Sequence, residues 1–127
     1  MTSIPWRVGE TSPGIGVMGL DGGLFFATAE AFDERVRGLI TGDQPVHALV
    51  IDLEGVGFID SQGAAKLTEI RDLTEAEGVT LRLARLGPRV RKVLDAEGLL
   101  DSVGADHVHG NVHRAVEAQR TVDGGHG

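Results

Sequence analysis

An apolar run in the middle of the chain constrains the fold more than any other feature. Residues 46–53 read VHALVIDL, where only a histidine and an aspartate interrupt the aliphatic side chains. A strand with one solvated face alternates apolar and polar residues, whereas this run is apolar at nearly every position. It therefore predicts a central β-strand with both faces covered, which is typical of a mainly parallel sheet with helices packed on it.

Strands and helices alternate around this run, with glycine, proline and capping residues between them. The expected elements are a hairpin of strands 15–20 and 24–27 with its turn at 21–23, a helix that Thr28 caps and Gly42 ends, the strand 46–53, a helix 61–77, a strand 79–84, a helix from Pro88 to Gly98, a short strand 106–109 and a helix from Asn111 to about residue 119. This order predicts an α/β layer fold with right-handed crossovers.

The length and composition suit one domain. The 127 residues are 41% hydrophobic, which is enough to form a single core. Residues 1–13 are predicted as a flexible lead-in, 14–120 as the folded domain and 121–127 as a disordered tail. The chain has no cysteine, so disulfides and thiolate metal sites are excluded. The net charge of −7 argues against nucleic-acid binding, because phosphates would be repelled.

The stretch DSQG, residues 60–63, joins the apolar segment before it to a predicted helix. Asp60 or Ser61 is a good N-cap, whose side chain accepts a hydrogen bond from a backbone N–H one turn into the helix. Gly63 allows close packing at the junction. A helix N-terminus at a strand end also suits an anion, and a phosphate on Ser61 would be stabilised by the helix dipole but repelled by Asp60. Capping, anion binding and phosphorylation all remain open at this stretch.

Other patterns are weak as signs of chemistry. GIGVMG at 14–19 matches the dinucleotide-binding pattern of glycines, but the glycines lie within a strand and no helix follows. His107, His109 and His113 lack a carboxylate or cysteine that would complete a metal site, so we expect no metal. Ser61 has no histidine nearby in the sequence and no nucleophile-elbow motif. The residues therefore favour a protein that is not an enzyme.

Two segments are candidates for contact with a partner. Five basic residues and no acidic residue lie between positions 82 and 92. They form either a solvated face or a surface on which Arg82, Arg85 and Arg89 meet an anion, an acidic partner or a lipid surface. Phe25 and Phe26 are adjacent in a predicted strand and would face opposite sides, so one of them would be exposed on a contact surface.

Taken together, these segments resemble the STAS domain, which is named for sulfate transporters and anti-sigma factor antagonists. The resemblance rests on FIDSQG with a helix after it, then GVTLRLA, then VRKVLDAEGLL. It covers roughly residues 15–120. The family implies a mixed central sheet of about four to five strands, with about four helices mostly on one side.

Two branches of this family imply different functions. In anti-sigma factor antagonists a partner kinase phosphorylates the serine after the aspartate, which would be Ser61 here. In sulfate-permease (SulP) transporters the STAS domain is a cytoplasmic C-terminal extension of a membrane protein. Residues 21–36, DGGLFFATAEAFDERV, resemble the transporter branch, although Thr28 replaces its usual asparagine. Gln62 stands where both branches usually carry serine or threonine, and this weakens a phosphorylation switch.

The resemblance to the transporter branch implies a regulatory domain without catalytic activity at the cytoplasmic face of the membrane, soluble as an isolated fragment. Its main partner would be the membrane domain of its own transporter, and a homodimer is compatible with the family. No cofactor is required, but the family has been proposed to bind guanine nucleotides, GTP or GDP. The residues implied for a nucleotide or anion are Thr28, Asp60, Ser61, Gln62 and Gly63.

Overall fold

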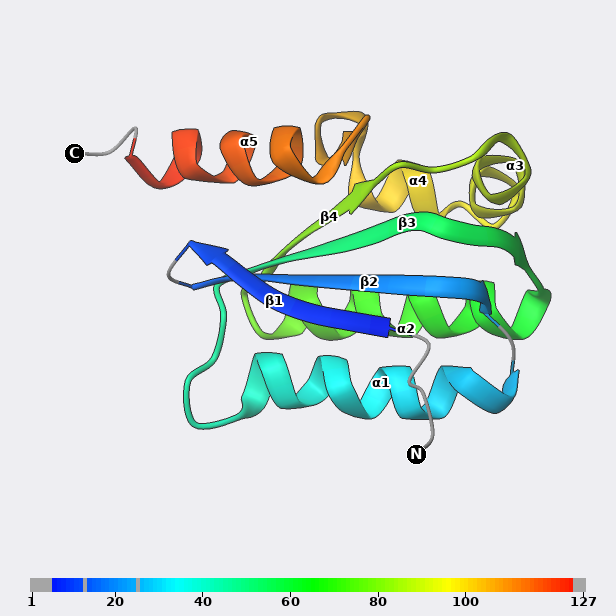
Figure 1. Ribbon diagram of the computed structural model, residues 1–127, viewed down its shortest axis with the longest axis horizontal. Coiled ribbons are helices and arrows are strands. Elements are labelled where there is room, and N and C mark those ends of the chain that lie inside the picture. The colour runs from blue at the N-terminus through cyan, green and yellow to red at the C-terminus, as the bar shows by residue number, and fades with distance from the viewer. Residues whose placement is uncertain (1–5, 13, 25, 125–127) are drawn as a thin grey trace.

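Strand β3 (Ala48–Ile59) lies at the centre of the structure. Its first six residues are all buried, so both faces of this half of the strand are covered, as the apolar run predicts. The computed structural model describes residues 6–12, 14–24 and 26–124, and within them the sheet has five strands in the order β1-β2-β3-β4-β5 (Figure 1). The other elements are therefore arranged around β3.

Parallel pairing dominates the sheet. β2 (Ile15–Leu24), β3, β4 (Thr80–Ala84) and β5 (Val108–His109) run parallel to one another, and β1 (Trp6–Ser12) pairs antiparallel with β2. Each parallel strand lies next to the one that precedes it in the chain, so right-handed crossovers place the connecting helices on one face. The predicted mixed sheet is confirmed.

The helices are divided unequally between the two faces. Those that connect parallel strands contribute side chains to one large core: α1 (Phe26–Thr41), α2 (Ser61–Ala76), α3 (Pro88–Ala96) and α4 (Leu99–Val103). A 3₁₀ turn, η1 (Ala105–His107), leads into β5. On the opposite face, Ala115 and Val116 of α5 (Val112–Gly124) pack with small and branched side chains of β2, β3 and β4. The prediction of helices mostly on one side is confirmed.

The predicted hairpin at 15–27 is wrong. β2 continues through the glycines of residues 21–23 to Leu24, and α1 already begins at Phe26. Because β3 is 12 residues long, it offers pairing partners for β2 as far as Ile59. The glycines coincide with two shifts of register between these strands instead of forming a turn. Thr28 is consequently the third residue of α1 and not its N-cap.

Both ends of the chain are more regular than predicted. The expected lead-in contains β1, whose sequence is flanked by Pro5 and Pro13, as suits a strand that pairs on one side only. At the other end α5 continues to Gly124, so residues 121–124 belong to a helix and not to a tail. Residues 1–5 and 125–127 lie outside the described residues.

The predicted boundaries in the second half of the domain are largely confirmed. Pro88 is the first residue of α3, where the missing N–H of proline leaves no hydrogen bond unmade. Gly98 follows this helix with φ 79°, a left-handed conformation that glycine adopts without strain. α2 and β4 also begin and end within about one residue of the predicted positions.

A buried arginine holds α5 to the second face of the sheet. Arg82 in β4 is 3% exposed, and its Nε donates a hydrogen bond of 3.0 Å to Oε1 of Gln119 in α5. Its Nη1 donates to the carbonyl oxygen of Asp106 at 3.4 Å and lies 3.1 Å from Nε2 of His109. Burial lowers the pKa of Arg82, because the charged guanidinium loses its hydration. The sequence predicted Arg82 on a solvated face or a contact surface, and this is wrong because α5 covers the side chain.

We predict that Gln119→Ala destabilises the domain by about 1–3 kcal/mol, because a buried charged donor loses its acceptor. Urea unfolding followed by circular dichroism measures the change. Gln44→Ala, at an exposed position after α1, is the matched control and should leave the unfolding midpoint unchanged. Equal midpoints for the two variants would show that the Arg82–Gln119 hydrogen bond contributes nothing.

Candidate functional site

The stretch DSQG forms the start of α2 at the carboxyl end of β3. Asp60 is the N-cap with φ −91° and ψ 177°, and its Oδ1 accepts a 2.7 Å hydrogen bond from the N–H of Gly63. The capping prediction is confirmed for Asp60, and Ser61 is the first residue of the helix. The Asp60 carboxylate therefore satisfies a backbone donor and lies at the positive end of the helix dipole.

The exposure of the residues changes abruptly after this cap. Ser61 and Gln62 are exposed, whereas Gly63 and Ala64 are buried against the core. Figure 1 shows that α1 and α2 begin at the same end of the molecule, so the backbone of Thr28 lies at the same end as Ser61. The side chain of Thr28 lies outside the described side chains. The structure thus presents a hydroxyl and an amide to solvent at the edge where two helices begin.

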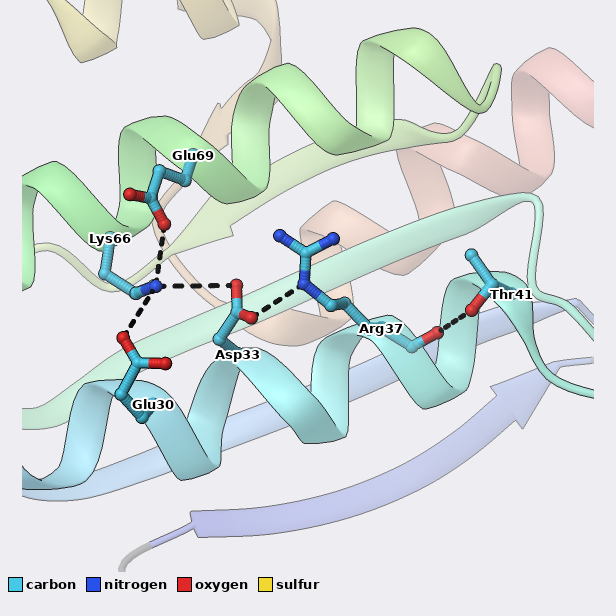
Figure 2. A network of polar contacts seen from close by, with 6 residues as sticks. All are labelled: Glu30, Asp33, Arg37, Thr41, Lys66 and Glu69. Atoms are coloured by element: carbon cyan, nitrogen blue, oxygen red, sulfur yellow. Dashed lines mark hydrogen bonds and ion pairs between the residues drawn. The ribbon is translucent and has the colours of Figure 1, made fainter.

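A network of charges joins the two helices behind this edge (Figure 2). Nζ of Lys66 in α2 lies 3.1 Å from Oε1 of Glu30 and 3.9 Å from Oδ1 of Asp33, both in α1. It also donates a 2.7 Å hydrogen bond to Glu69 within α2. Nε of Arg37 donates a 2.7 Å hydrogen bond to the other oxygen of Asp33. The network fixes α1 and α2 relative to each other close to the N-terminus of α2.

The opposite charges in this network stabilise one another's ionised forms. Its hydrogen bond to Glu69 raises the pKa of Lys66, and Glu30 and Asp33 add to this effect although burial opposes it. Asp33 is 7% exposed, and the pairing with Arg37 and Lys66 compensates for the burial of its carboxylate. This network was not predicted from the sequence. The spacings Asp33–Arg37 and Lys66–Glu69 indicate pairs within each helix, but pairing between helices depends on their packing.

The candidate contact residues are separated in the structure. Arg85 has a left-handed backbone with φ 59° and forms an ion pair with Glu54. Arg89 is exposed on the first turn of α3. Phe26 opens α1 and does not lie in a strand as predicted, and Phe25 lies outside the described residues. The prominent exposed aromatic among the described side chains is instead Phe58 of β3, which is 51% exposed and which the sequence analysis did not select.

His107 and His109 lie close enough to the buried Arg82 for its charge to affect them. His109 lies against Arg82, and burial lowers its pKa first, with the positive charges of Arg82 and His107 adding to the effect. Burial and Arg82 likewise lower the pKa of His107, although Asp106 opposes this. Among the residues that the structure describes, no three His, Cys, Asp or Glu side chains are grouped so as to hold a metal ion.

Comparison with known proteins decides the family. The family model of the STAS domain matches residues 8–115 of the chain. The chain belongs to the STAS domain family. Within the described residues, none of the helices of this STAS domain is long and apolar enough to cross a bilayer. The assignment agrees with the observed mixed sheet and with the Asp-Ser-x-Gly stretch at the start of α2.

Relatives of this STAS domain come from both branches. "Probable sulfate transporter Rv1739c" of Mycobacterium tuberculosis is 31% identical over 109 residues, which are 85% of this chain and 20% of the transporter. The SulP transporter STAS domain from Vibrio cholerae is 28% identical with a TM-score of 0.71, covering 86% of this chain and 81% of that one. An anti-sigma factor antagonist from Mycobacterium paratuberculosis is 26% identical with a TM-score of 0.73, covering 91% and 94%. The chain spans a fifth or less of the length of the first curated relatives that it matches.

We predict that Asp60→Ala lowers the free energy of unfolding by about 1 kcal/mol, because the N–H of Gly63 loses its acceptor. Asp60→Asn should retain most of the stability, since asparagine also caps helices. Urea unfolding of both variants separates hydrogen bonding from charge. If Asp60→Asn is as unstable as Asp60→Ala, the carboxylate acts through the helix dipole and not through the cap.

We also predict that stability falls as the pH drops below the ordinary histidine pKa of 6.5, because the folded chain keeps His107 and His109 neutral while the unfolded chain takes up protons. This contribution is fully present above pH 6.5. As the pH is lowered below 6.5, the urea midpoint should decrease less for His109→Gln than for the parent. His113→Gln, at an exposed position of α5, is the control and should retain the parent's dependence. Identical slopes for all three proteins would contradict this assignment.

Proposed function

We propose that this chain is the regulatory STAS domain of a SulP-type anion transporter and that it performs no chemistry. The observation that carries the proposal is its similarity, along most of its length, to a part of proteins named as sulfate transporters. On this proposal the domain lies at the cytoplasmic face of the membrane, after the membrane domain of the same protein. That membrane domain is its principal partner.

The edge at the start of α1 and α2 supports this role. Ser61 and Gln62 are exposed at an edge whose two helices are joined by the ion pairs of Lys66 with Glu30 and Asp33. A rigid edge with exposed polar side chains suits contact with another part of the transporter, because little conformational entropy is lost when it binds. Asp60 already serves as an N-cap, so its carboxylate has a structural role. These features fit a contact surface better than a reaction centre.

We expect the natural reading frame to encode several membrane-spanning helices upstream of this domain. Sequencing the adjacent coding region tests this directly, and a free-standing gene would refute the transporter proposal.

In the full-length transporter, Gln62→Lys should lower sulfate uptake into proteoliposomes. Thr121→Lys, an equally exposed substitution on α5, is the control and should leave uptake unchanged. Equal uptake by both variants would exclude this edge from regulation.

We further propose weak guanine-nucleotide binding at the same edge, involving Thr28 and residues 60–63. α1 and α2 begin at the same end of the molecule (Figure 1), and the first backbone N–H groups of a helix, which have no partner within it, are the donors that phosphate binding uses. Asp60 opposes an anion there, so the affinity should be low. Titration with GTP and GDP, followed by amide chemical shifts, should move the signals of Ser61 and Gln62 at millimolar ligand. Unmoved signals would refute nucleotide binding at this site.

A second candidate function is that of a soluble anti-sigma factor antagonist. It is favoured by the exposed hydroxyl of Ser61 at the first position of α2, and by the match to 94% of an antagonist chain. Incubation with an anti-sigma kinase and ATP, followed by mass spectrometry, distinguishes the two candidates. Phosphate on Ser61 that is absent from Ser61→Ala would support the antagonist.

Sedimentation velocity of the isolated domain tests the homodimer that the family allows.

A further inference from the structure

The second half of β3 leaves a groove beside α3. β4 pairs only with residues 48–52 of β3, so residues 54–59 extend past the end of β4. α3 lies next to this segment, and a groove of about 320 Å³ separates them. Its lining residues are Phe58 and Ile59 from β3 and Arg89, Lys92 and Val93 from α3. The volume is at the lower end of the range for ligand pockets, so the groove suits one or two apolar side chains.

The groove combines apolar walls with cations at its rim. Phe58 is 51% exposed, although an aromatic ring gains free energy when it is buried. Arg89 and Lys92 are exposed, and no carboxylate of the described residues forms an ion pair with either of them. Arg85, by contrast, is already paired with Glu54. The two remaining cations are therefore available to an acidic ligand.

Charge and shape favour a peptide over a membrane as the occupant. An anionic bilayer would attract Arg89 and Lys92, but it would repel a domain whose net charge is −7. A bilayer is also flat and cannot enter a groove between a strand and a helix. A peptide contacts only the groove and its rim, and beyond about 8 Å the remaining acidic residues are screened at physiological salt. It can also place an apolar side chain against Phe58 and Val93.

We propose that this groove binds an acidic peptide segment of a partner protein, with a large apolar side chain between Phe58 and Val93 and carboxylates on Arg89 and Lys92. Apolar burial supplies most of the affinity, and the charges set the orientation and the preference for acidic sequences. Ser61 and Gln62 are not among the residues that line this groove. It does not depend on whether the domain belongs to a transporter or to an antagonist.

The experiment measures binding of a fluorescein-labelled peptide in which Glu residues flank one Phe and one Leu. Fluorescence anisotropy should show saturable binding that weakens with added salt. Replacing the peptide's Glu by Gln, or its Phe and Leu by Ala, should weaken binding strongly. Absence of saturable binding by the acidic peptide, or equal binding of all three peptides, would overturn the proposal.

Variants of the domain locate the site. Arg89→Glu with Lys92→Glu should weaken binding of the acidic peptide by about tenfold or more, because attraction becomes repulsion. Phe58→Ala should weaken it without changing its salt dependence. Arg114→Glu, which makes the same kind of charge change at an exposed position of α5, should bind as the parent does. Circular dichroism confirms that each variant is folded, since all these side chains are at least partly exposed.

Two other outcomes would identify a different occupant and refute the proposal. Vesicles of phosphatidylcholine and phosphatidylserine attract aromatic and basic surfaces, so co-sedimentation with them is measured for the same variants. Loss of vesicle binding in Arg89→Glu/Lys92→Glu, without peptide binding by the parent, would assign the groove to the membrane. Self-association of the parent that the same substitutions abolish would assign it to a second copy of the chain.

Discussion

Burial of the first half of β3 on both faces is the constraint on which the rest of the structure depends. Once residues 48–53 are removed from water, the sheet needs a neighbouring strand on each side and a layer on each face. β2 and β4 supply the neighbours, and the crossover helices cover one face. α5 covers the other. In this arrangement β2 is followed by α1 and β3 by α2, and the start of α2 places Ser61 and Gln62 at an exposed edge.

The second half of β3 is not covered on both faces. Past the end of β4 it keeps β2 as a neighbour, and Glu54, Gly57 and Phe58 are exposed although Val56 and Ile59 stay buried. The change occurs within one strand, between Leu53 and Glu54. One element thus serves both the core and the surface, which explains how an aromatic side chain such as Phe58 comes to line an open groove.

Local patterns predicted much of this fold. The cap at Asp60, the start of α3 at Pro88 and the glycine after it all depend on neighbours in the sequence, and all were found. The hairpin failed because DGG also fits an extended strand when a long partner lies beside it. No local pattern distinguishes these two uses of glycine, since the length of β3 decides between them.

The candidate site was predictable to a smaller degree. Exposure of Ser61 and burial of Gly63 follow from their positions in the first turn of a helix. The contacts of Lys66 with α1 and of Arg82 with α5 join residues that are far apart in the sequence. Such contacts depend on which helix faces lie together. A sequence pattern indicates that a charge is present but not which side chain it meets.

The two faces of the sheet also differ in the amount of apolar surface that their helices bury. The main core contains large side chains such as Phe32, Met18 and Leu94, whereas α5 contributes mainly Ala115 and Val116. Local unfolding begins where little apolar surface is buried, so α5 is the segment that can detach while the four remaining helices stay packed. Amide hydrogens of α5 should then exchange faster than those of α2. The C-terminal helix is accordingly the element whose opening depends most on a single polar contact, the hydrogen bond between Arg82 and Gln119.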